Sequence, residues 1–214
     1  MRMLMKKVQN RGFTLIELLV VIAIIAILAA VLTPTVTDAL TRGKMTGTLA
    51  NGRSIHQALF AKDIEDPILQ TGSPYPRSGS GPGAFANSTL YWRNVVTSGI
   101  MRVDFSFFSA PGITPLKGTN ASLFTADNNA WCITADITDA SVDVTPLLFT
   151  RNLNINALNT AANFDYASQM TENPPFGRKG LPTVLKGGSG VIFKPDNING
   201  NFFPGGTNQV VLRP

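Results

Sequence analysis

The longest apolar segment of the chain lies near its N-terminus. Fifteen consecutive apolar residues end at Leu32, and only Thr14 and Glu17 are polar between Phe13 and that leucine. Twenty residues of α-helix at about 1.5 Å per residue span roughly 30 Å, which is the hydrocarbon thickness of a bilayer. The pattern therefore predicts a transmembrane helix over residues 13–36.

A second helical segment follows Pro34, which lacks a backbone N–H and is expected to kink the helix. Over residues 37–65, apolar residues fall roughly along one side of a helix: Leu40, Met45, Leu49, Ile55 and Leu59. Three glycines each weaken this half by up to ~1 kcal/mol relative to alanine but permit close approach of helices: Gly43, Gly47 and Gly52. We expect the helix to end near Lys62–Glu65, ahead of Pro67.

The remaining residues, 66–214, alternate short ordered segments with turns. Residues 70–88 are rich in Gly, Pro and Ser and predict a surface loop, and residues 89–99 predict a short helix. Alternating apolar residues from Trp131 to Ile137 predict a half-buried strand. Further strands are predicted at 147–150, 184–185, 191–194 and 209–212. Short strands joined by turns favour an antiparallel sheet, so we predict an α+β fold in which this sheet packs on the second half of the long helix.

The basic residues are concentrated before the apolar segment. Arg2, Lys6, Lys7 and Arg11 precede it without an acid among them, which predicts a cytoplasmic N-terminus and an exported C-terminal part. The chain carries a net charge of +5, but residues 13–214 hold 14 basic and 13 acidic side chains. No basic cluster with interleaved aromatic residues occurs there, so a nucleic-acid partner is not expected.

The junction between the basic and apolar parts carries a motif. The string Arg11-Gly12-Phe13-Thr14-Leu15-Ile16-Glu17, followed by the apolar run and Pro34, resembles the class III signal of type IV pilins and type II secretion pseudopilins. The resemblance implies that a prepilin peptidase cuts after Gly12 and methylates Phe13. It divides the chain into a leader peptide (1–12), a transmembrane half (13–36) and an amphipathic half (37–65) of one spine helix, and an exported α+β domain (66–214).

Glu17 needs a partner, because an unpaired charge inside a bilayer costs about 2.5–3.5 kcal/mol or more. It lies in the first turn after Phe13, where a carboxylate complements the helix dipole, and cleavage would free an α-amino group at Phe13. That amine belongs to the same molecule or to a neighbour in a filament. The resemblance implies the neighbour, which makes Glu17 an assembly residue. Alternatively, Glu17 reaches the lipid headgroups from the helix end.

Two other interpretations of the apolar segment remain open. In a secretory signal removed by signal peptidase the apolar stretch is about 7–15 residues long and followed by an A-x-A site. This stretch is longer, and no A-x-A occurs within residues 20–35. In the second interpretation, the segment serves only as a membrane anchor for an exported binding module.

Candidate chemical groups are few. Cys132 is the single cysteine, so no intramolecular disulfide forms, and its apolar strand-like setting predicts buried packing. His56 is the single histidine, and a surface or packing role is favoured over metal binding or catalysis. No G-x-S-x-G motif and no phosphate loop occur, so an enzyme is not expected.

One cluster of oxygen ligands suggests calcium as the only cofactor to consider. It comprises Asp127, Asp136, Asp139 and Asp143, with Asn128 and Asn129. Calcium takes six to eight oxygens, and the resemblance includes the major pseudopilins, which hold calcium in a loop. The spacing matches no EF-hand, and Asp and Asn are common in turns for their own backbone bonding.

We therefore predict a pilin-like structural subunit that polymerises through its helix. A type II secretion pseudopilin, assembled into a periplasmic pseudopilus, is favoured because the lone cysteine excludes the disulfide found in some type IV pilins. A type IV pilus subunit is the alternative. By resemblance, the partners are prepilin peptidase, other pilin-like subunits, an inner-membrane assembly platform and membrane lipid. The expected location is the bacterial inner membrane, with one span and a periplasmic domain.

Overall fold

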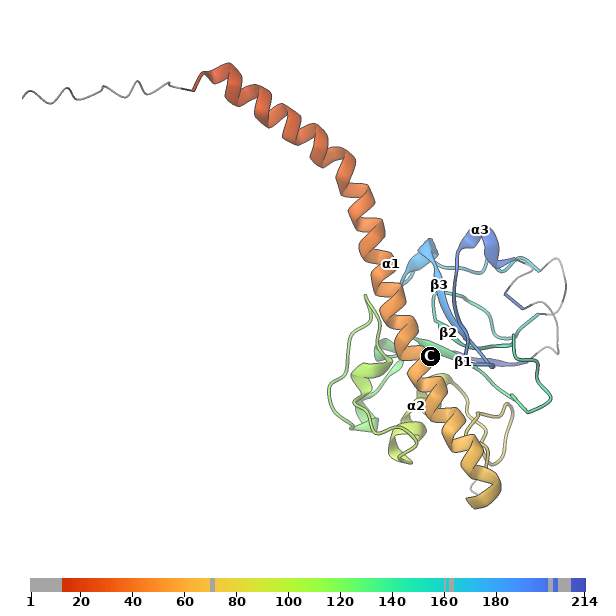
Figure 1. The fold of residues 1–214 in the computed structure, drawn as a ribbon. Helices are drawn as coiled ribbons and strands as arrows, with labels where there is room; N and C mark the ends of the chain where they lie inside the picture. The colour runs from red at the N-terminus through yellow and green to blue at the C-terminus, as the bar shows by residue number, and fades with distance from the viewer. Residues whose placement is uncertain (1–12, 70–71, 160, 162–163, 200–201, 204–208) are drawn as a thin grey trace, which may run out of the picture. The chain divides into compact units, whose positions relative to one another are not determined.

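The computed structural model describes residues 13–69, 72–159, 161, 164–199, 202–203 and 209–214 (Figure 1). The contacts divide the chain into two compact units, Met1–Arg42 and Gly43–Pro214, and each is described by itself. The predicted leader, residues 1–12, lies outside the described residues.

One long helix belongs to both units. Helix α1 runs from Leu15 to Leu69 and continues through Pro34 without a break in its assignment, so the bend at this residue stays a prediction. The predicted end at Lys62–Glu65 needs correction, because the helix continues about one turn further, past Pro67. The φ of proline is compatible with a helix, and the single i→i−4 hydrogen bond that Pro67 removes belongs to the last turn.

In the first unit the helix is apolar on all sides. The large apolar side chains from Leu15 to Leu32 are 45–84% exposed. This is the one helix among the described residues that is long and apolar enough to cross a membrane. A helix that is apolar all round needs lipid or other helices around it.

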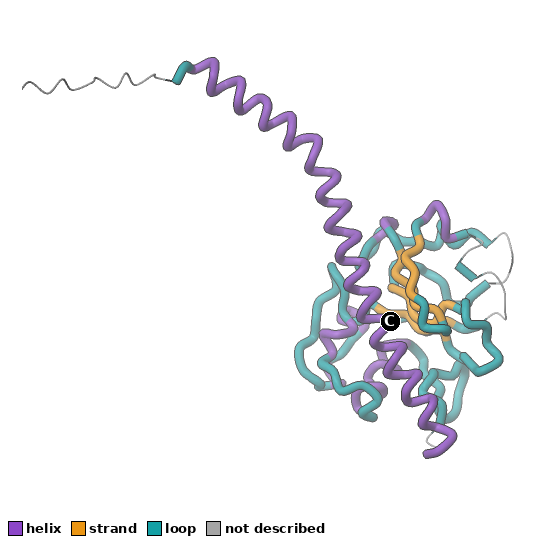
Figure 2. The backbone as a smooth tube through the Cα atoms, viewed as in Figure 1, coloured by secondary structure: helices purple, strands orange, loops and turns teal. Residues whose placement is uncertain are grey.

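The second unit contains a five-stranded antiparallel sheet (Figure 2). Its strands are β1 (Trp131–Thr134), β2 (Pro146–Thr150), β3 (Leu181–Leu185), β4 (Gly190–Phe193) and β5 (Val211–Leu212). The order across the sheet is β4-β3-β2-β1-β5, and every neighbouring pair is antiparallel. The α+β fold with an antiparallel sheet is thus confirmed, and each predicted strand has a counterpart.

The central strands β1 and β2 are buried on both faces, which corrects the half-buried strand predicted for Trp131–Ile137. All four residues of β1 are buried. Trp131 and Ile133 pack into a core shared with Leu49, Ile55 and Leu59 of α1. Cys132 points to a second core, formed with side chains from later loops: Leu158, Tyr166, Ile198 and Phe202.

Helix α2 (Ser88–Thr97) joins the first core and confirms the short helix predicted there. The Asn87 side chain caps it by accepting from the N–H of Leu90, and Gly99 follows its end with a φ of 78°. Short helical turns complete the fold: η1 (Phe105–Phe108), η2 (Ala121–Leu123), η3 (Ala126–Asn128), η4 (Gly177–Lys179) and α3 (Pro195–Ile198).

Candidate functional site

Thr14 and Glu17 close the N-terminal end of α1 with reciprocal hydrogen bonds. The N–H and Oγ1 of Thr14 donate to Oε2 of Glu17 at 2.9 and 2.7 Å, and the N–H of Glu17 donates to Thr14 Oγ1 at 3.3 Å. Thr14 directly precedes the helix, so the pair forms a capping box. The carboxylate stands where the helix N-terminus favours negative charge.

The role of Thr14 was missed by the sequence analysis, although the pattern Thr-x-x-Glu before an apolar run is a known helix-start pattern. Phe13 immediately precedes the box and is 76% exposed. Gly12, the predicted cleavage residue, lies outside the described residues. The structure therefore places Phe13 and Glu17 at the same helix end, one turn apart.

Threonine hydroxyls line the helix around Pro34. Oγ1 of Thr33 donates to the carbonyl of Ala29 at 2.7 Å, and Oγ1 of Thr37 donates to that of Pro34 at 2.8 Å. Oγ1 of Thr41 donates to the carbonyl of Thr37 at 2.8 Å. Such bonds satisfy hydroxyls that have no water partner in lipid and are often found where helices bend.

The four predicted calcium ligands are not brought together. Asp127 lies in η3, while Asp136 accepts from the N–H of Ser78 at 3.0 Å and from its hydroxyl. Asp143 lies 3.9 Å from Nζ of Lys186, which also donates to the carbonyl oxygen of Asp139 at 3.0 Å. Within the described parts of the chain, no group of three or more His, Cys, Asp or Glu residues is placed to hold a metal. Calcium binding stays a prediction that this arrangement does not support.

The two neighbouring asparagines have structural roles instead. Oδ1 of Asn128 accepts from the N–H and the hydroxyl of Thr125, both at 3.1 Å. Asn129 is fully buried: its Oδ1 accepts from the N–H of Trp131 at 2.9 Å, and its Nδ2 donates to Oγ of Ser88 at 2.9 Å. Asn129 thus links the start of α2 to β1.

Replacing Asn129 with alanine is expected to lower the free energy of unfolding by about 2 kcal/mol, because the buried N–H of Trp131 loses its acceptor. Chemical denaturation of the full chain in detergent measures the change. The exposed Asn156 provides a control, since its replacement by alanine should stay within about 0.5 kcal/mol of wild type. Equal stability of the two variants would contradict the structural role of Asn129.

His56 and Cys132 both have the packing roles predicted for them. Nε2 of His56 lies 2.7 Å from the carbonyl oxygen of Lys186, and its ring stacks on Phe60 with centroids 6.0 Å apart. Cys132 is fully buried, and burial raises the pKa of its thiol to about 12. A thiol in this state is a poor nucleophile.

A groove of about 730 Å³ lies beside the last turns of α1 in the second unit. It is lined by the helix, by the loop containing Tyr75, by the β1–β2 loop and by the β3–β4 turn. Burial, together with the nearby carboxylates of Asp63 and Asp139, raises the pKa of Tyr75 to about 12. The groove therefore brings together apolar and acidic groups from four parts of the sequence.

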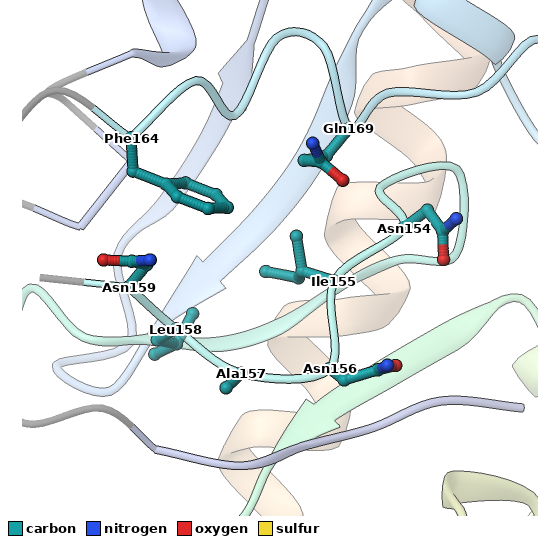
Figure 3. Close-up of a pocket in the computed structure, with 8 residues that line it drawn as sticks. All are labelled: Asn154, Ile155, Asn156, Ala157, Leu158, Asn159, Phe164 and Gln169. Carbon is teal, nitrogen blue, oxygen red and sulfur yellow. The ribbon is translucent and has the colours of Figure 1, made fainter. Parts of the chain in front are cut away.

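A smaller pocket of about 340 Å³ is lined by residues 154–159, Phe164 and Gln169 (Figure 3). Figure 3 shows Phe164, Asn159, Leu158 and Ile155 around it, with Gln169 at its edge. Its amides bond within the chain, since Oδ1 of Asn159 accepts from the N–H of Ala161 at 2.8 Å and Nε2 of Gln169 donates to Ser168 at 3.0 Å. These bonds hold the loop that covers the second core.

Comparison with known proteins follows the motif and the fold. The model of the prokaryotic N-terminal methylation motif matches residues 7–33. The type IV major alpha-pilin of Moraxella bovis is 33% identical over 114 residues, which are 51% of this chain and 68% of that pilin. The chain belongs to the type IV pilin-like family. No solved structure matches it.

Membership of the type IV pilin-like family agrees with the prepilin-type signal and with the α+β architecture seen here. The family is a structural one. Its methylation motif and the apolar α1 together indicate a membrane-anchored protein. In such a pilin-like chain, the Thr14–Glu17 box lies within the segment that the methylation motif covers.

Proposed function

We propose that this chain is a precursor of a filament subunit: prepilin peptidase cuts it after Gly12, and the product polymerises through α1. The observation that carries the proposal is the apolar helix of the first unit, whose large side chains are 45–84% exposed from Leu15 to Leu32. The methylation motif over residues 7–33 supports cleavage and methylation at Phe13.

The exposed helix has two suitable surroundings. Before assembly, lipid covers it, and the basic residues 2–11 hold its N-terminus in the cytoplasm while the domain lies outside the inner membrane. On assembly, apolar helices of other subunits replace the lipid, because leaving a bilayer for water would expose the whole apolar surface. Extraction requires an inner-membrane platform as a partner.

Glu17 gives the assembly its register. A carboxylate among apolar helices is stabilised by a cation, and the methylated amine of Phe13 on an incoming subunit supplies one. The capping box holds the carboxylate at the helix end until that amine arrives. The bonds to Thr14, 2.7 and 2.9 Å long, support this orientation.

Two kinds of filament fit the family. The match to the type IV major alpha-pilin supports a type IV pilus subunit as the first candidate. A single cysteine cannot form an intramolecular disulfide, and some type IV pilins have such a disulfide. This favours a type II secretion pseudopilin, although not every type IV pilin has a disulfide. Each of the two systems has its own assembly ATPase. Deleting the ATPase of the type IV pilus or that of type II secretion in the host distinguishes the two candidates, because only loss of the ATPase that assembles this subunit should abolish its filaments.

Replacing Gly12 with leucine is expected to abolish processing, because the peptidase recognises a small residue before the cut. Intact-mass and N-terminal analysis of the membrane form should show a start at methylated Phe13 for wild type and retention of residues 1–12 in the variant. Gly43→Leu, at a glycine of α1 with open space around it, is the control and should be cut normally.

A wild-type chain that keeps residues 1–12 in cells with active peptidase would overturn the proposal. So would a product in which the helix itself is missing, since a removed secretory signal leaves no spine for assembly. A plain anchor for a binding module predicts a third result, an uncut chain whose function is unaffected by Gly12→Leu.

A further inference from the structure

The groove beside the end of α1 exposes apolar surface in the second unit. Phe60 and Ile64, on the helix, are 50% and 58% exposed. Val142 and Val144, in the neighbouring β1–β2 loop, are each 46% exposed. Large apolar side chains that gather around a groove are typical of an interaction surface.

The groove is also acidic. Asp63, Asp139 and Asp143 line it, and Lys186 is the one lysine or arginine among its described lining residues. Nζ of Lys186 donates to the carbonyls of Asp139 and Ser141 at 3.0 and 2.6 Å and lies 3.9 Å from the carboxylate of Asp143. Three carboxylates against one ammonium group leave a net negative charge, so a basic partner suits this surface.

The opposite end of the same unit carries basic residues. A Cβ on Gly180 would come 2.8 Å from Sδ of Met45. Strand β3 therefore begins beside the part of α1 with which the second unit starts. Leu181 of β3 pairs with Phe193 of β4, which places Lys194 at the same end. This end contains Lys44, Arg178, Lys179 and Lys194 against the acids Glu172 and Asp196.

The acidic groove and the basic end are well separated. Met45 and Ile64 lie about 28 Å apart along α1 at 1.5 Å per residue. At the groove end, the β3–β4 turn lies on His56, as the contact of that ring with the Lys186 carbonyl shows. The β3–β4 hairpin runs from Met45 to His56 along α1, with its open end at the basic residues and its turn at the groove.

We propose that the groove receives the basic end of a second copy of this chain, so that successive domains contact each other head to tail along α1. The inference rests on the proposed filament function and names the domain surfaces that fix the contact. A head-to-tail interface uses two different patches of one chain, and such interfaces build open filaments when the rotation does not close.

The chemistry of the two surfaces is complementary. The aliphatic stems of Lys44 and Lys179 cover the exposed Phe60 and Ile64, while their ammonium groups reach the carboxylates at the rim. Opposite charges steer the two domains into one register and disfavour like-to-like pairing of the same ends. A second copy is the occupant because the same chain carries both surfaces.

Paired charge reversals test the contact. Asp139 and Asp143 are exposed, as are Lys179 and Lys194, so Asp139→Lys with Asp143→Lys and Lys179→Glu with Lys194→Glu leave the fold intact. Each pair alone should reduce filaments sheared from cells at least about tenfold, because like charges then face each other. All four changes in one chain should restore filaments to within about twofold of wild type. Lys117→Glu, exposed and away from both surfaces, is the control and should have no effect.

Cysteine cross-linking supplies a second measurement that does not depend on rescue. Asp139→Cys combined with Lys179→Cys should give oxidised ladders of subunits, whereas neither change alone should. The native Cys132 does not compete, since it is fully buried.

Reversal variants that assemble like wild type would overturn the head-to-tail contact, and so would the joint absence of rescue and of ladders. In both results, a processed wild-type chain that forms filaments leaves the proposed function standing. A wild-type chain that is never processed or never forms filaments overturns the proposed function and this contact with it.

Discussion

The variant Gly52→Ala is expected to lower the free energy of unfolding by about 3 kcal/mol, near the upper end of the cost of overpacking a core. A Cβ at this position would lie 2.6 Å from Cη2 of Trp131 and 3.0 Å from Cγ2 of Val184. Trp131 and Val184 are fully buried, so neither side chain has space to move. Denaturation of the full chain in detergent, followed by tryptophan fluorescence, measures the loss.

Gly47 provides the matched control in the same helix. A Cβ there would meet nothing within 4 Å, so Gly47→Ala should stabilise the chain by up to ~1 kcal/mol through helix propensity. Opposite signs for the two variants would establish close packing at Gly52 as the cause. Destabilisation by both, or a neutral Gly52→Ala, would contradict it.

These glycines show what helical periodicity predicts and what it leaves open. In the sequence, Gly43, Gly47 and Gly52 predict close approach between helices. In the structure, Gly52 admits Trp131 of the chain's own sheet, whereas Gly43 and Gly47 have open space. The pattern identifies small residues but not their neighbours, because the neighbour comes from a strand that begins at Trp131.

The strands were predictable because each is a short apolar run between turn residues. Their burial was not. Alternation in residues 131–137 predicts one exposed face, but Cys132 is covered by Tyr166, Phe202 and other side chains from later loops. A local pattern contains no information on which distant loop will cover a face, so the second core appears only in the folded chain.

The candidate functional residues likewise include some that the sequence predicts and some that only the folded chain brings together. The processing motif is contiguous, so roles for Gly12, Phe13 and Glu17 could be predicted from the sequence, and the capping box follows from local spacing. The acidic groove could not be assigned, because it joins Asp63, Tyr75, Asp139 and Lys186 from four segments. Two of the four aspartates predicted as calcium ligands, Asp139 and Asp143, line this groove.

The variant Glu17→Val should insert into the membrane and be processed but enter filaments at least about tenfold less than wild type. Valine lowers the cost of the helix in lipid, since it removes a charge that costs about 2.5–3.5 kcal/mol there. It also removes the partner of the incoming amine, so the register of assembly is lost. Membrane fractionation measures insertion, and immunoblotting of sheared filaments measures incorporation.

Glu17→Gln separates the charge from the cap. Glutamine can still accept from Thr14 as a capping-box residue, but it cannot pair with an ammonium group as a carboxylate does. If the amine of Phe13 is the partner, the glutamine variant should fail in filaments as the valine variant does. Filaments restored by glutamine would instead assign Glu17 to helix capping alone. Asp127→Val removes an exposed acid of η3, outside the groove and outside α1, and should assemble normally.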